Sequence, residues 1–439
     1  MILENYDMFG AVERTAGALR NILDYHGVVA PHTGEPFTEA LLMGIGGGLG
    51  AEYATWAFIG IDSKSPGKSR LYLRFHHVKN YVEKGEETAI YKIAARIGAQ
   101  LRVKKTASRA KGFTNLVEPL KEGHPVITGL AVWESLKLQR EVKARYEEHP
   151  HLYGPLLYDE FVHFLPYYSL PYGWVKGHLA IVYGVDEEAN QAYIADWSNK
   201  PLTISLDELA EARGVVNRIK NTTIVVEPPT SAPQLEKAVQ AGIRDCYRGL
   251  LEGYMSAVRV EAWKVMGSHM GSYKDKLSWS RLFSEPVLLF DALTRLHAQI
   301  DFLNSDGGAL RSSYSDFLLE ASEILHKPEL REVAVQFADV GTRWDDLEAL
   351  ALPDDIPLLR ETRFAAVEWN NAFKVKGQSA TEEVEAKAER IKDIREEVAH
   401  AFPLTDKELL NFLRELGSHV LEIYETERAA LTALKTAVS

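Results

Sequence analysis

A histidine and an aspartate flank a predicted β-hairpin near the middle of the chain. The stretch GHLAIVYGVDEEANQAYIADW, residues 177–197, has β-rich runs at 179–185 and 191–195 on either side of the polar sequence DEEAN. An antiparallel pairing of these runs places His178 and Asp196 nearly opposite each other, close enough for their side chains to meet. The carboxylate would then hold one ring nitrogen protonated and raise the basicity of the other. The spacing predicts a general base with its orienting carboxylate, although solvent or backbone could also satisfy two polar residues at strand ends.

A nucleophile or metal ion to accompany such a base has no clear candidate in the sequence. The single cysteine, Cys246, falls on a helical stripe of apolar residues, which is typical of a buried core position. A metal site near His149 and His151 would recruit Asp159 and His163, but these residues lack a familiar ligand spacing. We therefore expect a structural cysteine, no metal ion and no organic cofactor.

A glycine-rich run, GIGGGLGAEY at residues 44–53, contains Gly46, Gly48 and Ala51 in a spacing that can mark a dinucleotide-binding turn. That fingerprint requires a preceding strand, whereas the segment before this run has a helical pattern. The run therefore predicts a tight turn with close backbone packing near a pocket.

The elements that must position these residues change in type along the chain. A helix is predicted over residues 15–27 with Gly27 as its stop, and a second over 37–44 with Thr38 as its N-cap. Strand-like runs follow at 70–75, 124–132, 179–185, 191–195 and 222–226. Helices first and strands later, without regular βα alternation, indicate an α+β fold.

The sequence VEPPTSAP, residues 226–233, predicts a linker between two domains, 1–228 and 234–439, because its prolines deny the backbone regular hydrogen bonding. Amphipathic helices are predicted beyond it at 234–255, 316–326, 329–350, 358–373, 381–401 and 405–438. An insertion around 133–164 interrupts the first domain, where it could form a lid, a pocket wall or a simple surface excursion.

Composition narrows the class of partner. The chain has 439 residues, a formal net charge of −12, 46% hydrophobic residues and 26% charged residues. An acidic balance disfavours nucleic acid, whose phosphates need a clustered basic surface. Neither a signal peptide nor a long apolar run is evident, so we expect a cytoplasmic protein that does not associate with membranes.

Several segments, in this order, resemble the N-terminal domain of the butirosin-biosynthesis protein H family. They are ALRNILDYHG, FTEALLMGIGGGLGAEY, GHPVITGL, LPYY and GHLAIVYGVDEEANQAYIADWSNKPLTISLDELAEAR. The later segment YSDFLLEASEILHKPELREVAVQFADVGTRWDDL is similar to the helical domain that follows in that family. The resemblance implies a papain-like cysteine-peptidase-type domain followed by an all-helical domain. It also implies transfer of an acyl or aminoacyl group from an acyl-carrier-protein thioester to a small-molecule amine in specialised metabolism.

The resemblance assigns His178 and Asp196 to the family's histidine and aspartate, but the family's cysteine position is occupied by Arg14 and the preceding histidine position by Glu13. Arginine is permanently protonated and offers no lone pair, so it cannot act as a nucleophile. Thr15 is a poor substitute because one residue turns a helix by about 100°. Two interpretations stay open: His178 activates an acceptor amine for direct attack on the thioester, or the fold has lost catalysis and binds a metabolite, peptide or protein.

In either case we expect the remaining residues of the predicted site to contact substrate or the developing oxyanion; they are Arg14, Thr15, Glu39, Gly46, Gly47, Gly48, Tyr167 and Tyr168. Arg14 could serve as an anion contact or as an ion-pair partner of Glu13 or Asp196. The role of Glu39, in the protein core or at the substrate, is left open. An acyl carrier protein and an amine acceptor are the expected partners, and the long C-terminal helices could also pair two chains into a homodimer.

Overall fold

The computed structural model describes residues 1–58, 68–76, 88–131, 177–215, 220–253, 256–303 and 305–438. These residues form an α+β structure that divides into two compact units. Unit 1 comprises residues 1–46, 78–238 and 371–384, and unit 2 comprises residues 47–77, 239–370 and 385–439. The two units therefore interleave along the chain.

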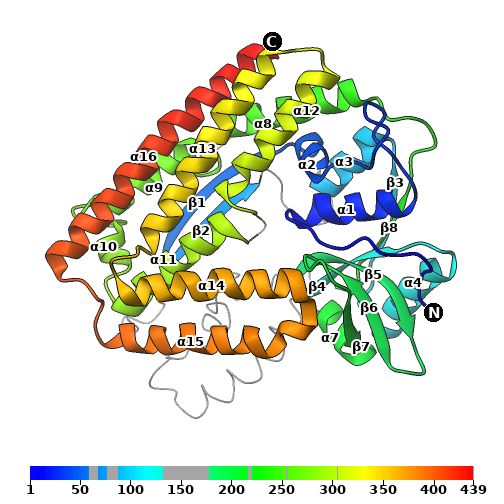
Figure 1. The fold of residues 1–439 in the computed structure, drawn as a ribbon, viewed down its shortest axis with the longest axis horizontal. Helices are drawn as coiled ribbons and strands as arrows, with labels where there is room; N and C mark the ends of the chain where they lie inside the picture. The colour runs from blue at the N-terminus through cyan, green and yellow to red at the C-terminus, as the bar shows by residue number, and fades with distance from the viewer. Residues whose placement is uncertain are drawn as a thin grey trace. The chain divides into compact units, whose positions relative to one another are not determined.

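Unit 1 is built on an antiparallel sheet whose six described strands have the order β3-β8-β4-β5-β6-β7 (Figure 1). The strands are β3 (Gln100–Lys104), β4 (Val126–Ala131), β5 (Gly177–Asp186), β6 (Gln191–Ala195), β7 (Leu202–Ser205) and β8 (Thr223–Glu227). The described helices are α1 (Arg14–Tyr25), α2 (Glu39–Ile45), α3 (Ala89–Ile97), α4 (Arg109–Lys121) and α7 (Leu206–Val215). Helix α1 packs against α2, α3 and β5, whereas α4 and α7 contact each other and strand β4.

Local capping fixes the ends of the first two helices. At the start of α1, Glu13 Oε2 accepts a hydrogen bond from the Ala16 backbone N–H at 2.7 Å. Gly27, with φ of +67°, follows its end in the left-handed conformation that glycine adopts without strain. Helix α2 begins after Thr38, whose Oγ1 accepts from the Leu41 N–H at 3.0 Å. The predicted stop and N-cap are therefore confirmed.

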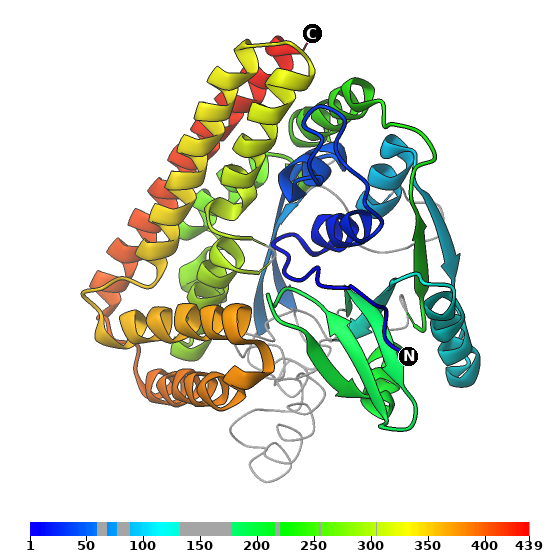
Figure 2. The same cartoon turned by 45° about the vertical axis from the view of Figure 1, so that its right-hand side comes forward.

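Unit 2 combines an antiparallel hairpin, β1 (Leu49–Phe58) and β2 (Lys68–His76), with long helices. These are most of α8 (Leu235–Glu252), α9 (Glu261–Gly271), α10 (Trp279–Leu282), α11 (Pro286–Asp301), α12 (Arg311–Ile324), α13 (Glu329–Ala351), the first part of α14 (Pro357–Lys376), the later part of α15 (Thr381–His400) and α16 (Asp406–Ala437). Short 3₁₀ turns are η1 (Ser256–Val258) and η2 (Gly308–Leu310) in unit 2 and η3 (Gly377–Ala380) in unit 1. Figure 2 shows α13 in yellow and α16 in red running side by side.

A buried ion pair lies in the core of unit 2. Arg311 Nη2 contacts Glu427 Oε1 at 2.6 Å, and neither side chain has any exposed surface. The Arg311 guanidinium also donates to the backbone oxygens of Gly50 and Ala309, and its carbon lies 5.8 Å from the centre of the Trp344 ring. Buried charge is tolerated only when it is paired and hydrogen-bonded, and these contacts meet that requirement. They also join α12, which carries Arg311, to β1, η2, α13 and α16.

The predicted helices of the second half and the predicted strands of the first half are confirmed, each to within a few residues at its ends. The two-domain division at 228/234 stays a prediction, since the compact units are defined by packing and each takes segments from both halves. The insertion around 133–164 lies outside the described residues. Among the helices in the described part of the chain, none is long and apolar enough to cross a membrane.

Candidate functional site

The hairpin β5–β6 determines where His178 and Asp196 lie on the backbone. Ile181 pairs with Ala195, so continuing the register by one residue brings Asp196 opposite Ala180. A bulge between Val182 and Gly184 sets this register. The predicted arrangement is therefore corrected: His178 is a diagonal neighbour of Asp196, two residues along β5, instead of lying nearly opposite to it.

Diagonal neighbours on one face of a sheet are still within reach of long side chains. The imidazole of His178 lies outside the described part of the structure, and the hydrogen bond between His178 and Asp196 stays a prediction.

Arg14 is the first residue of α1 and lies beside Asp196 within unit 1. Burial lowers the pKa of the Arg14 guanidinium, and the nearby carboxylates of Asp196 and Glu13 oppose that shift. The guanidinium carbon lies 4.4 Å from the centre of the Trp197 ring, in the geometry of a cation–π contact. The structure thus brings Arg14 close to Asp196, although the two residues are far apart in the sequence.

Asp196 itself is held by its local backbone. Its Oδ1 accepts a hydrogen bond from the Trp197 N–H at 2.9 Å. The Trp197 ring packs against Phe373, with ring centroids 4.8 Å apart. Phe373 comes from the segment 371–384. In the same segment the Lys374 backbone oxygen accepts a hydrogen bond from the Asn199 N–H, and the Gln378 side-chain amide both accepts from and donates to the backbone of Thr203 in β7. Sequence reasoning missed Trp197 and Phe373 as members of this site.

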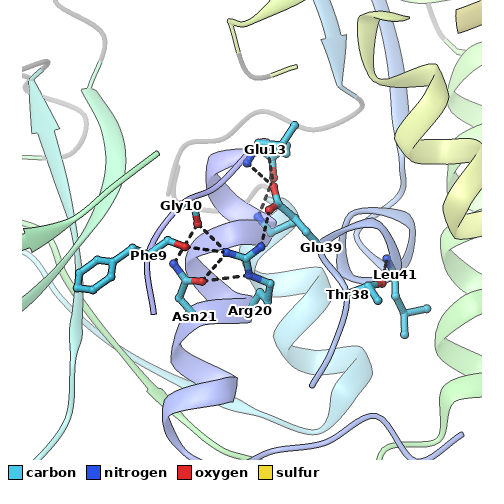
Figure 3. A network of polar contacts seen from close by, with 10 residues as sticks. Phe9, Gly10, Glu13, Arg20, Asn21, Thr38, Glu39 and Leu41 are labelled. Atoms are coloured by element: carbon cyan, nitrogen blue, oxygen red, sulfur yellow. Dashed lines mark hydrogen bonds and ion pairs between the residues drawn. The ribbon is translucent and has the colours of Figure 1, made fainter. Parts of the chain in front are cut away.

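Glu39 anchors the turn that leads into α1 (Figure 3). Its Oε1 accepts from the backbone N–H groups of Val12 and Glu13 at 2.8 and 2.5 Å, and its Oε2 lies 3.3 Å from Arg20 Nη1. Arg20 in turn donates to the Gly10 backbone oxygen at 2.7 Å. Burial raises the pKa of Glu39 to about 7, against the opposing effects of Arg20 and these N–H donors. The described contacts of Glu39 support the backbone before Arg14, which favours the structural role left open by the sequence.

The predicted glycine turn connects the two units. Gly46 follows α2 as the last residue of unit 1, while Gly47 and Gly48 begin unit 2 with φ of +117° and +67°. A Cβ on Gly48 would lie 2.4 Å from the Tyr314 ring, so close backbone packing requires glycine there. A role for these glycines at an oxyanion stays a prediction, as does any role for Thr15, which is buried in α1. Tyr167 and Tyr168 lie outside the described residues.

Cys246 is a core residue, as its spacing predicts. It lies on α8 with no exposed surface. Burial raises the pKa of its thiol to about 11, although the nearby Tyr314 side chain opposes the shift. A thiol that is buried and protonated at neutral pH is a poor nucleophile.

Comparison with known proteins finds a family model that matches part of the chain. Residues 205–356 match the family model described as Domain of unknown function (DUF4872). The match begins in β7 of unit 1 and ends after α13 of unit 2. A search of curated proteins returns no match.

Proposed function

We propose that this chain is a butirosin-H-like acyltransferase with a papain-like N-terminal fold, moving an acyl or aminoacyl group from a carrier thioester to an amine. The single observation that supports it is the proximity of Arg14, at the start of α1, to Asp196, which follows β6. The family resemblance requires these two positions to face one cleft, although they are far apart in the sequence.

In the proposed reaction, the amine nitrogen attacks the thioester carbonyl and forms the amide bond. His178 accepts the proton that the nitrogen loses, and the thiolate of the carrier leaves with the electrons of the C–S bond. The protonated His178 then returns its proton to the thiolate or to solvent. Asp196 orients the imidazole and stabilises its positive form. Thioesters are reactive enough for positioning and base catalysis to suffice without a covalent intermediate.

A second candidate is a catalytically silent protein that binds a metabolite, peptide or protein. The observation that favours it is the same Arg14 guanidinium, which lies against Asp196 and Trp197. A permanent cation beside Asp196 competes with His178 for that carboxylate and opposes the formation of an imidazolium. The contact between Arg14 and Asp196 would therefore hinder the base catalysis of the first candidate and would help the second candidate to bind an anionic ligand.

Turnover of synthetic substrates distinguishes these candidates. The full chain would be incubated with acyl thioesters of an acyl carrier protein and with polyamines or aminoglycosides, and amide formation followed by mass spectrometry. We expect His178→Ala to lower the rate by about 10²- to 10⁴-fold, the usual contribution of a general base. His32→Ala, in the turn after α1, is the matched control and should retain the wild-type rate.

Equal turnover by wild type and His178→Ala would exclude the histidine-base mechanism. Absence of turnover with every donor, together with saturable binding of an amine or a carrier protein by calorimetry, would support the silent binding protein.

A further inference from the structure

A histidine and two carboxylates converge between two helices of unit 2, and none of them belongs to the proposed acyl-transfer site. His297 and Asp301 are four residues apart on α11 and so project from one face of that helix. Glu348 projects from α13. One nitrogen or oxygen atom from each side chain lies within 4.8 Å of the other two. Three such atoms at this separation can share a single cation.

His297 is buried and directed toward this cluster. Its side chain has no exposed surface, and its Nδ1 contacts Glu348 Oε1. Its Nε2 makes no hydrogen bond to any residue that the structure describes. Buried polar atoms almost always have a partner, so an imidazole in this condition points to a ligand that the protein chain does not supply. Asp301 and Glu348 are only half-buried, which leaves a path for an ion from solvent.

Negative charge accumulates around the cluster. Glu348, Asp345 and Asp306 each lie close enough to Asp301 for their negative charges to interact with it. Asp301 and Glu348 thus belong to a group of four neighbouring carboxyl groups. Carboxylates crowded together in this way are stabilised by a bound cation.

Within the described part of the chain, Asp345, unlike the three converging residues, accepts a hydrogen bond from the protein backbone. Its Oδ1 accepts a hydrogen bond from the Gly308 N–H at 2.5 Å and so attaches η2 to α13. Gly307 and Gly308 adopt φ of +84° and +56°, which lets the turn approach that carboxylate. Asp345 therefore contributes charge near the cluster while its described bond holds the turn.

We propose that His297, Asp301 and Glu348 bind a divalent first-row transition-metal ion between α11 and α13. One imidazole with two carboxylates suits Zn²⁺ or Mn²⁺, whereas Ca²⁺ and Mg²⁺ prefer oxygen ligands alone. Three protein ligands leave at least one coordination position to water. The ion would join the C-terminal end of α11 to α13.

Metal binding by the full chain tests this site directly. Chelator-treated protein would be titrated with ZnCl₂, and separately with MnCl₂, by isothermal calorimetry. We expect one equivalent to bind to wild type. Asp301→Asn and Glu348→Gln, which keep the side-chain shape and remove one anionic ligand, should each weaken binding at least about 10-fold. Asp345→Asn keeps an oxygen for the Gly308 N–H and is the matched control, expected to change affinity by much less.

Substitution with Co²⁺ provides a second measurement that needs no variant. The visible absorption of Co²⁺-loaded wild type should show bands of a nitrogen- and oxygen-ligated site, which one equivalent of Zn²⁺ abolishes. Circular dichroism of the metal-free variants checks that each has folded. The proposal is overturned if wild type binds no stoichiometric metal, or if the Asp301→Asn/Glu348→Gln double variant binds as tightly as wild type.

Discussion

In the fold that we propose for unit 1, Arg14, the first residue of α1, stands at the position of the thiol. Asp196 and Trp197 lie against it, and Glu13 caps the same helix. The guanidinium therefore lies at the N-terminus of α1, near the carboxylates of Asp196 and Glu13. An introduced thiol at this location would meet the same surroundings.

We predict that Arg14→Cys produces a reactive cysteine. A thiol at a helix N-terminus has a lowered pKa and reacts faster with electrophiles. Iodoacetamide at neutral pH should alkylate Arg14→Cys at least about 10-fold faster than Cys246 of wild type, whose thiol is buried with a pKa of about 11. Intact-mass spectrometry with time gives both rates.

Thr15→Cys, one residue further along α1 and buried, is the matched control for position. If Arg14→Cys is alkylated no faster than Thr15→Cys, the start of α1 does not face a reactive cleft.

Glu39 should make stability depend on pH. Its pKa is about 7 in the folded protein against 4.5 for an ordinary glutamate, so the folded state holds a proton that the unfolded chain has released. Stability from this residue is fully present below pH 4.5 and is lost as pH rises through about 7, by about 3 kcal/mol. Urea unfolding between pH 5 and 8 measures it.

Glu39→Gln cannot titrate and should flatten this part of the pH profile. Glu35→Gln, at an exposed position of the preceding turn, should keep the wild-type slope. A profile of Glu39→Gln that parallels wild type throughout would show that Glu39 does not hold a proton in the folded state.

Part of the site at this scale could be predicted from the sequence. The spacing of His178 and Asp196 about a polar turn predicts that they share a hairpin, but the bulge at Val182–Gly184 has no sequence signal that would give the diagonal register. The proximity of Arg14 to Asp196 depends on tertiary packing and follows only from the family resemblance. His297 and Asp301 at positions i and i+4 were an available signal, and it was missed because α11 was not predicted.

Helices α9 and α16 show how a contact between elements depends on two glycines. A Cβ on Gly267 would lie 2.7 Å from the Gly417 backbone oxygen, and a Cβ on Gly417 would lie 2.6 Å from the Gly267 backbone oxygen. The two helix backbones therefore approach each other directly at this crossing. Any side chain larger than hydrogen must push them apart.

We predict that Gly417→Ala destabilises the protein by about 1–3 kcal/mol, the usual cost of overpacking. This loss should outweigh the gain of up to about 1 kcal/mol that alanine provides in a helix. Thermal and urea unfolding give the change. Gly271→Ala is the matched control on α9, because a Cβ there meets no atom within 4 Å, and it should be neutral or slightly stabilising. A stabilised Gly417→Ala would contradict the close crossing.

Four of the elements that escaped prediction did so for identifiable physical reasons. Helix α11 is buried at every residue from Leu289 to Ala298, so its polar residues, among them Asp291 and Arg295, lie inside the protein and do not mark an exposed face. Strand β3 is only five residues long, and strand β7 only four. Strand β1 begins within the glycine run, which hides its start. By contrast, α13 and α16 are long and have one buried and one exposed face, so the helical spacing of their apolar residues predicts both helices.

At the scale of the whole molecule, the membership of the two compact units does not follow the order of helices and strands along the chain. The predicted linker at 226–233 overlaps the end of β8; the described strands precede it in the sequence and long helices follow it. Packing then assigns the hairpin β1–β2 to the helical unit and the segment 371–384 to the sheet-containing unit. No local pattern encodes such exchanges, because they depend on contacts between residues hundreds of positions apart.

The segment 371–384 has a consequence for how the protein is made. It brings Phe373 onto Trp197 and bonds the backbone at Asn199 and Thr203, so unit 1 lacks this cover until that segment has been synthesised. At roughly 5–20 residues per second, a ribosome needs on the order of ten seconds or more to reach it after Trp197. During that interval the nascent chain carries an uncovered aromatic surface beside Asp196, open to chaperones and to misassembly with neighbouring chains.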